Sequence, residues 1–220
     1  MSKHARKAQA ALDNNKAYRA LKICDKGLGR KPPAQDCYAL RAEALNRTGD
    51  PREAIVNARM GMRYVPTAAT AELQLGIGYH AIGMRDSAEI AYRNILESNV
   101  GTEARYRLAL VERETGRIPE ALNDLKTVTT ADPNNAKYMR DRGVTFALLG
   151  DSAGARADFD RTVEMEPENP VNWNTRGFHR YASFGDHQRA IKDYNAAIKL
   201  DKNHGYAFNN RGWSKYKLGN

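Results

Sequence analysis

The sequence is poor in the residues that usually mark covalent stapling, metal binding or membrane insertion. It has only two cysteines, Cys24 and Cys37, and no paired Cys/His spacing of the kind that binds zinc. We interpret both as small buried apolar side chains, and a disulfide between them stays open. No apolar run approaches the roughly 18 residues of a membrane-spanning helix. The sequence therefore predicts neither a disulfide framework nor a membrane span.

The N-terminal segment also lacks the features of a secretory signal. Residues 1–12 are basic and then alanine-rich, without an apolar stretch or a cleavage site. This absence favours the cytoplasm, although a signal peptide removed beforehand would leave the same sequence.

Motifs of catalysis are absent as well. The five histidines share no spacing with carboxylates that would indicate a metal site: His4, His80, His179, His187 and His204. The glycines Gly76 and Gly78 lack the preceding strand and the downstream acidic residue of a dinucleotide site. No phosphate loop or nucleophile motif occurs. We expect no enzymatic activity, no cofactor and no metal.

What the sequence does contain is a repeat. Small residues recur about every 34 positions at Ala8, Ala42, Gly76, Ala109, Gly143, Gly177 and Gly212. A second column of small residues runs in step with the first at Ala20, Ala54, Ala88, Ala121, Ala155 and Ala190. Two phased columns predict a tandem array in which each unit packs on its neighbours, and such arrays usually present a surface to a partner.

Each repeat has the pattern of two helices. In residues 136–169, two apolar runs with helical spacing are separated by Gly150 and Asp151 and end before Pro167. The glycine ends the first helix in a left-handed conformation, the aspartate caps the second, and the proline terminates it. The predicted turn glycines are Gly49, Gly83, Gly116, Gly150, Gly185 and Gly219.

The small columns have a packing explanation. Gly or Ala lets two antiparallel helices approach closely, and a larger side chain on the partner helix fills the space. That larger column is Cys24, Ala58, Tyr92, Leu125, Phe159 and Tyr194. A glycine inside a helix costs about 1 kcal/mol relative to alanine. Steric need is therefore the expected reason for Gly76, Gly143, Gly177 and Gly212.

This pattern resembles the tetratricopeptide repeat family, most closely in residues 136–169 and 170–204. The resemblance implies an all-α fold, a right-handed α-solenoid of antiparallel helix pairs whose first helices line a concave side. It covers the chain as a single array, residues 1–220. The repeats are expected at 1–34, 35–68, 69–101, 102–135, 136–169 and 170–204, with a partial repeat at 205–220.

Two repeats depart from the pattern. The fourth has Arg105 and Glu112 where an aromatic pair would pack, so these side chains either pair with each other or are solvated. The sixth has one extra residue between Gly177 and Gly185. If that residue lies in the turn, Tyr181 faces outward; if it bulges the helix, Tyr181 belongs to the core.

The predicted binding surface is the concave face of repeats four to seven. It is rich in aromatic and amide side chains, with a cation beside them, and it suits a peptide that carries an acidic group. A packing role of the aromatic residues is the alternative. The candidate groove residues are Tyr106, Arg107, Arg140, Val144, Asn174, Phe178, Tyr181, Asn209, Asn210, Trp213 and Tyr216.

Two further observations limit this surface. Some members of the family bind a C-terminal carboxylate with a Lys and an Asn one helical turn apart. This pair is missing here, because Val144 stands one turn after Arg140 and Phe178 stands one turn after Asn174. In repeats two and three the equivalent positions are mixed and offer no clear ligand chemistry: Leu40, Glu43, Asn46, Arg47, Leu73, Ile77 and His80.

Charge is concentrated at the N-terminal end. Residues 1–66 contain 14 Lys and Arg against 6 Asp and Glu, whereas residues 67–220 contain 21 against 20. An ordinary solvated face or an anionic partner would both account for this. Few aromatic residues interleave with these charges, so a stacking platform for single-stranded nucleic acid is disfavoured but nucleic acid stays open.

The last helix is expected to leave Phe208 and Leu218 incompletely covered. Either a longer array has been cut short, or Lys215 and Lys217 make this helix a cap; an uncovered end would also favour an end-to-end homodimer. The leading hypothesis is a non-enzymatic scaffold that binds a peptide segment of a partner protein in its concave groove. The alternatives are electrostatic binding of nucleic acid or an anionic surface through repeats one and two, and a structural module of a larger protein.

Overall fold

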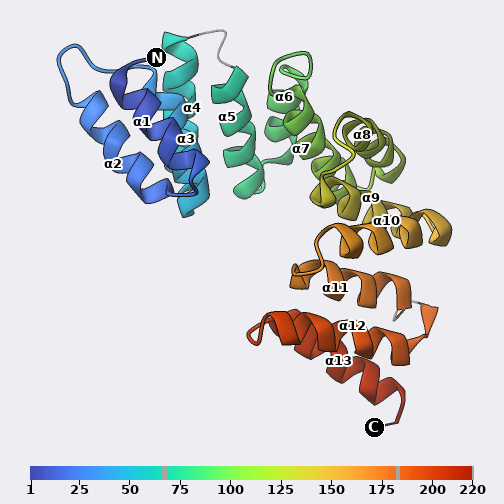
Figure 1. The fold of residues 1–220 in the computed structure, drawn as a ribbon. Coiled ribbons are helices and arrows are strands. Elements are labelled where there is room, and N and C mark those ends of the chain that lie inside the picture. Colours follow the sequence, from blue (N-terminus) through green and yellow to red (C-terminus); the bar gives the residue numbers. More distant parts are fainter. Residues whose placement is uncertain (66–68, 182–183, 220) are drawn as a thin grey trace. The chain divides into compact units, whose positions relative to one another are not determined.

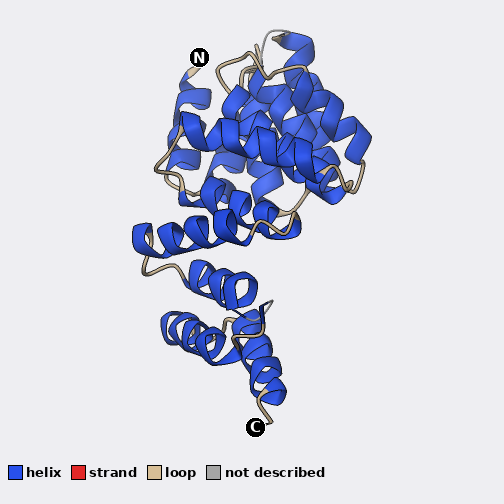
Figure 2. Cartoon of the chain, turned by 90° about the vertical axis from the view of Figure 1, so that its right-hand side faces the viewer, coloured by secondary structure: helices blue, strands red, loops and turns tan. Residues whose placement is uncertain are grey.

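The computed structural model describes residues 1–65, 69–181 and 184–219, without the side chains of residues 180 and 181 (Figure 1). Across these ranges the chain consists of helices joined by short turns and contains no strand (Figure 2). The chain divides into two compact units, Met1–Val111 and Glu112–Asn220. The prediction of an all-α fold is confirmed.

Unit 1 is built from successive helices, and each helix from α1 to α5 packs on the next. The helix α3 also contacts α1 and α5, so first helices lie beside first helices. The helices are α1 (Lys3–Asp13), α2 (Ala17–Leu28), α3 (Cys37–Thr48), α4 (Pro51–Tyr64), α5 (Ala69–Ala81), α6 (Arg85–Arg93) and most of α7 (Gly101–Glu114).

In unit 2 the main contacts again join helices that are neighbours in the sequence. Its elements are α8 (Ile118–Ala131), α9 (Ala136–Leu148), α10 (Ser152–Met165), α11 (Pro170–Arg176), a π-helical segment η1 (Gly177–Tyr181), α12 (His187–Leu200) and α13 (Gly205–Lys217).

The turns within the helix pairs are those that the sequence predicts. All six turn glycines have φ between 78° and 90°, the left-handed region in which glycine is favoured. Three of the second helices, α4, α10 and α12, begin with side-chain caps: the carboxylates of Asp50, Asp151 and Asp186 accept hydrogen bonds from backbone N–H groups three residues on, at 3.1, 2.9 and 3.1 Å. The local signals therefore specify where each pair turns.

Close helix contact explains three of the four helix glycines. A Cβ atom added to Gly76 would lie 2.5 Å from the ring of Tyr92, one on Gly143 would lie 2.8 Å from Phe159, and one on Gly177 would lie 2.9 Å from Tyr194. These three aromatic side chains are completely buried. The steric expectation is wrong for Gly212, because among the described residues nothing lies within 4 Å of a Cβ atom there.

The departures of repeats four and six are accommodated differently. The extra residue of repeat six lies in the helix: α11 continues directly into η1, whose wider hydrogen-bonding pattern takes in one residue. The side chain of Tyr181 is outside the described residues. In repeat four, Glu112 is only 2% exposed, so the solvated alternative is wrong for this carboxylate.

The two cysteines are free and buried, as interpreted from the sequence, and the alternative of a disulfide is wrong. A hydrogen bond with Cys37, together with burial, raises the pKa of the Cys24 thiol. Both side chains belong to the core between α1, α2 and α3. They act as small packing residues beside Ala8 and Ala20.

Candidate functional site

The first helices of unit 1 line a groove. Two adjoining depressions of about 250 and 460 Å³ share four lining residues, Gln9, Glu43, Thr70 and Gln74. We call the larger one the unit 1 groove, and it runs from α1 across α3 and α5 to α7. Its lining residues are Gln9, Glu43, Asn46, Arg47, Thr70, Leu73, Gln74, Ile77, Val100, Glu103 and Arg107.

The groove combines apolar side chains with amides that are already oriented. Leu73 and Ile77 supply apolar surface. The Asn46 side-chain amide donates to the backbone oxygen of Gln74 at 2.9 Å and to its side-chain oxygen at 3.0 Å. An amide side chain offers both a donor and an acceptor, which matches the needs of a peptide backbone.

The charges of the unit 1 groove occur as opposite pairs on the same helix. On α3, Arg47 donates to the Glu43 carboxylate, and on α7 the Arg107 Nε donates to Glu103 Oε1 at 2.7 Å. Burial is the largest influence on the Glu43 carboxyl and raises its pKa, although Arg47 acts in the opposite direction. A carboxylate kept in a concave surface against its desolvation cost is a feature of functional sites.

The structure assigns the two predicted unit 1 residues to different environments. The Tyr106 side chain is 2% exposed and offers almost no surface to a ligand. Its neighbour Arg107 lines the groove.

Most residues judged to offer no clear ligand chemistry do line the two depressions: Leu40, Glu43, Asn46, Arg47, Leu73 and Ile77. Sequence reasoning did not single out Gln9 or Gln74. Gln74 had a visible signal, because it is the only polar residue in the apolar run from Leu73 to Gly78.

In unit 2, the predicted residues form two separate polar contacts. The Arg140 Nη1 donates to the Asn172 Oδ1 at 3.0 Å, and the Asn210 amide donates to the Asn174 Oδ1 at 3.1 Å. The second contact joins first helices α11 and α13. Since the partner of Arg140 is a neutral amide, its positive charge is not neutralised by an ion pair within the described residues.

The predicted aromatic residues of unit 2 are partly exposed. Phe178 is 41% exposed and meets the His179 ring edge-on, with centroids 4.9 Å apart. Trp213 is 46% exposed, meets His187 edge-on at 5.1 Å and has the Lys217 ammonium 5.4 Å from its ring centre. The remaining predicted positions range from half-buried to exposed: Val144, Asn209 and Tyr216.

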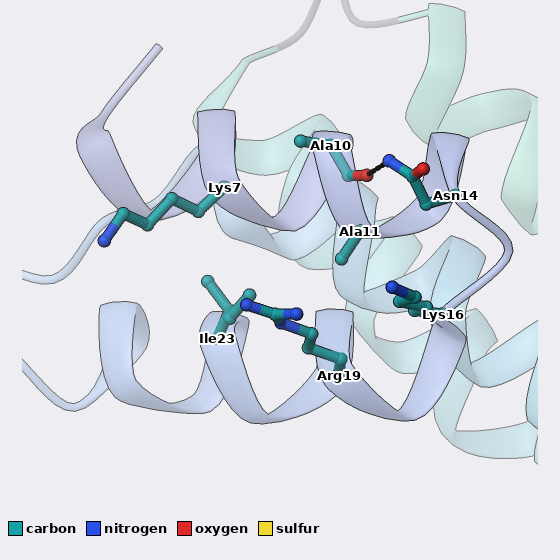
Figure 3. A pocket seen from close by; sticks show the side chains of 7 residues that line it. All are labelled: Lys7, Ala10, Ala11, Asn14, Lys16, Arg19 and Ile23. Atoms are coloured by element: carbon teal, nitrogen blue, oxygen red, sulfur yellow. Dashed lines mark hydrogen bonds between the residues drawn. The ribbon is translucent and has the colours of Figure 1, made fainter.

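A third surface lies on α1 and α2 and is strongly basic (Figure 3). Its depression, of about 360 Å³, is lined by Lys7, Ala10, Ala11, Asn14, Lys16, Arg19 and Ile23. A second depression shares Lys7 and Ile23 with it and adds Lys3, His4, Lys26 and Arg30. We call the two together the α1–α2 basic face.

The described residues contain neither a candidate metal site nor a candidate membrane span. No group of three or more His, Cys, Asp or Glu side chains there could hold a metal ion. Nor does any helix within those ranges have the length and apolar character needed to cross a membrane.

Comparison with known proteins gives matches to tetratricopeptide repeats. Models of the tetratricopeptide repeat family match residues 106–170 and 173–204. The "Tetratricopeptide repeat protein 13" of Homo sapiens is 30% identical over 139 residues, which are 58% of this chain and 16% of that protein. The chain spans about a third or less of the length of the curated relatives that it matches.

Solved structures give the same likeness at the level of the fold. A tetratricopeptide repeat protein from Parabacteroides merdae has a TM-score of 0.72 at 18% identity, covering 96% of this chain and 83% of that chain. YrrB, described as a TPR protein with an unusual peptide-binding site, has a TM-score of 0.60 at 19% identity, covering 93% of this chain and 97% of that chain. At such identities the likeness concerns the fold alone.

Proposed function

We propose that this chain, which is a tetratricopeptide repeat protein, is a non-enzymatic scaffold that binds an extended peptide segment of a partner protein along its first helices. Repeats of this family serve protein–protein interaction. The finer proposal is that the unit 1 groove takes the peptide.

The observation that carries the proposal is the amide contact over an apolar floor. Asn46 and Gln74 are held by two hydrogen bonds next to Leu73 and Ile77. An extended peptide exposes backbone donors and acceptors at every second residue, with side chains between them. Because the Asn46 amide donates to Gln74 and its own side-chain oxygen is buried, the Gln74 Nε2 group is the preoriented donor for a peptide carbonyl. Its orientation costs little further side-chain entropy on binding, while Leu73 and Ile77 bury a residue of the peptide.

Unit 2 supports a second contact of the same kind. The hydrogen-bonded amides of Asn174 and Asn210 join two neighbouring first helices, and Arg140 retains a charge that no carboxylate neutralises within the described residues. An acidic side chain of a bound peptide would supply that carboxylate.

The test uses Thr70, an exposed residue that lines both depressions. Random 12-residue peptides displayed on phage are selected on the full chain, and their affinities are measured by fluorescence polarisation. Thr70→Trp fills the groove without removing a core contact, so we expect affinity to fall about tenfold or more. Val56→Trp on α4, at a side chain that is 59% exposed, is the matched control and should bind as the wild type does. Equal binding by both variants would place the peptide elsewhere.

The electrostatic alternative is favoured by one observation, the α1–α2 basic face. If duplex nucleic acid were the ligand, its affinity would fall steeply with salt, because bound phosphates release counterions. The affinity for a peptide that is bound by amides and apolar contacts depends far less on the salt concentration. Titrations of a 20-base-pair duplex and of a selected peptide at low and high salt therefore separate the two functions.

A further inference from the structure

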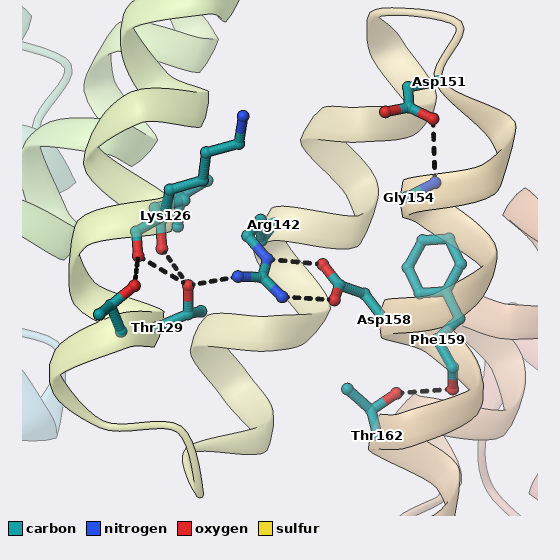
Figure 4. A network of polar contacts seen from close by, with 10 residues as sticks. Lys126, Thr129, Arg142, Asp151, Gly154, Asp158, Phe159 and Thr162 are labelled. Carbon is teal, nitrogen blue, oxygen red and sulfur yellow. Dashed lines mark hydrogen bonds and ion pairs between the residues drawn. The ribbon is translucent and has the colours of Figure 1, made fainter.

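In five of the seven repeats, the residue before the first column of small residues is a cation. We call these residues the cation column: Lys7, Arg41, Arg142, Arg176 and Arg211; in the other two repeats the position is Leu75 or Leu108. In unit 2, Arg142 forms two parallel hydrogen bonds with Asp158, at 2.7 and 2.8 Å (Figure 4). Arg176 makes the same bidentate contact with Asp193, at the same two distances. In both cases the carboxylate stands directly before the large core residue of the second helix in the same pair.

A second oxygen comes from the preceding helix pair. Arg41 meets Asp25 of α2 at 2.8 Å, and Arg176 meets Asp160 of α10 at 3.3 Å. Asn195 of α12 takes this place for Arg211, at 2.8 Å. Where one pair stacks on the previous one, the earlier second helix thus places an oxygen against the cation of the column.

Lys7 is the exception in this column. The position that corresponds to Asp158 and Asp193 is Ile23, which cannot accept a hydrogen bond. None of Lys7, Lys16 and Arg19 has an ion pair among the described residues, and all three side chains are exposed.

The segment around Lys7 also carries an excess of positive charge. Residues 1–31 contain nine Lys and Arg against two Asp and Glu. One of the two, Asp25, is bound to Arg41, and the other, Asp13, accepts a hydrogen bond from Gln9. In the described part of the chain, the residues that line the depression drawn in Figure 3 include no carboxylate.

We propose that the α1–α2 basic face binds an acidic α-helix of a partner protein, whose carboxylates meet Lys7 and Arg19. The pattern on the other helix pairs motivates the choice of a helix: α2 packs on α3, and α10 packs on α11, each with a carboxylate against the column cation. On α1 no carboxylate of the described residues meets Lys7, and Ala10, Ala11 and Ile23 form an apolar floor for the contact. This site shares no lining residue with the unit 1 groove and is independent of the proposed peptide function.

Other anionic ligands fit this face less well. Its depression is small and has an apolar floor, whereas a nucleic-acid duplex offers only phosphates spaced along a wide backbone. No aromatic side chain lines it, so stacking of single-stranded bases has no platform. An amphipathic helix with apolar and acidic side chains on one face could cover the apolar floor and also place carboxylates against Lys7 and Arg19.

The probe is a blocked, hydrocarbon-stapled peptide with the α10 sequence, residues 152–165, carrying Arg156→Glu and Arg161→Glu. The control peptide has every carboxylate replaced by its amide. The chain is tested as the wild type, as Lys7→Glu/Arg19→Glu, and as Arg6→Glu/Lys22→Glu. The last variant makes the same charge change on the same two helices, but its residues are exposed and line neither depression.

We expect the acidic peptide to bind the wild type and the Arg6/Lys22 variant alike, and the Lys7/Arg19 variant about tenfold more weakly. The amide peptide should bind all three weakly. Ile23→Asp, checked for folding by circular dichroism, should also weaken binding, because it gives Lys7 an internal carboxylate. Equal losses in the two double variants would overturn the proposal. So would tighter, Lys7-dependent binding of a 20-base-pair duplex or of phosphatidylserine vesicles.

Discussion

At the scale of single residues, the glycines inside helices show how closely the helix pairs approach. Gly143 lies against the fully buried ring of Phe159 and the Cβ atom of Asp158, whereas Gly212 occupies the same repeat position with open space around it. The same residue type therefore has a steric reason at one position and none at the other.

Substitution by alanine should separate these two cases. Gly143→Ala should destabilise the chain by about 1–2 kcal/mol, since overpacking outweighs the gain in helix propensity. Gly212→Ala should stabilise it by up to about 1 kcal/mol. Urea unfolding of the two variants measures both effects. A Gly143→Ala protein as stable as the wild type would contradict the packing assignment.

Glu43 predicts a pH dependence at the residue scale. Burial raises the pKa of this carboxyl in the folded state, so the folded chain binds the proton more tightly than the unfolded chain does. Stability is then lost as pH rises through and above the usual glutamate pKa of about 4.3. Glu43→Gln should raise the melting temperature at pH 7, and the gain should vanish as pH falls below that value.

Calorimetry between acidic and neutral pH tests this expectation. Glu168→Gln removes the same charge from an exposed side chain and serves as the control. A Glu43→Gln variant that melts below the wild type at pH 7 would mean that the ion pair with Arg47 outweighs the cost of burial.

At the scale of elements, the π-helical segment η1 is where the repeat absorbs an insertion. The glycine pair Gly143 and Gly150 is seven residues apart, and the corresponding pair Gly177 and Gly185 is eight apart. Deleting Arg180 should restore regular α-helix and leave the melting temperature unchanged or raised, because π-turns are less favourable. Deleting Val144 from α9 rotates every later residue of that helix by about 100° and should lower it. The melting temperatures of the two deletion variants are measured by monitoring circular dichroism during heating. An equal decrease in both melting temperatures would contradict the π-bulge.

The helix ends could be predicted from the sequence, because turn and cap signals act within four residues. The positive φ at Gly150 and the cap at Asp151 are examples. The location of the extra residue of repeat six could not, since a longer turn and a bulged helix satisfy the same pattern. The burial of single candidate residues could not be predicted either. Helical spacing gives the direction in which the Tyr106 or Gln74 side chain points, but its exposed fraction depends on the size of neighbours from other helices.

At the scale of the whole molecule, the cation column links folding to binding. Arg142 and Arg176 are satisfied inside the helix pairs of unit 2, and such bidentate pairs specify how the helices align. Lys7 belongs to the same column and has no acceptor within the described residues. The same column position thus contributes to helix packing in unit 2, through Arg142 and Arg176, and offers a cation to a ligand in the first repeat, through Lys7. In our proposal, the excess of Lys and Arg in the first repeats serves to bind an acidic helix.

Contacts that join mainly neighbouring helices predict that stability is local along the chain. In such arrays each repeat depends on its own packing and on that of its neighbours. Gly76→Ala, which brings a Cβ atom to 2.5 Å from Tyr92, should reduce amide hydrogen-exchange protection mainly in α5 and α6 and leave α12 and α13 close to the wild type. Gly177→Ala should give the reverse pattern. A uniform loss of protection from α1 to α13 in both variants would instead mean that the chain unfolds as one cooperative body, and a local defect would then weaken both candidate binding surfaces together.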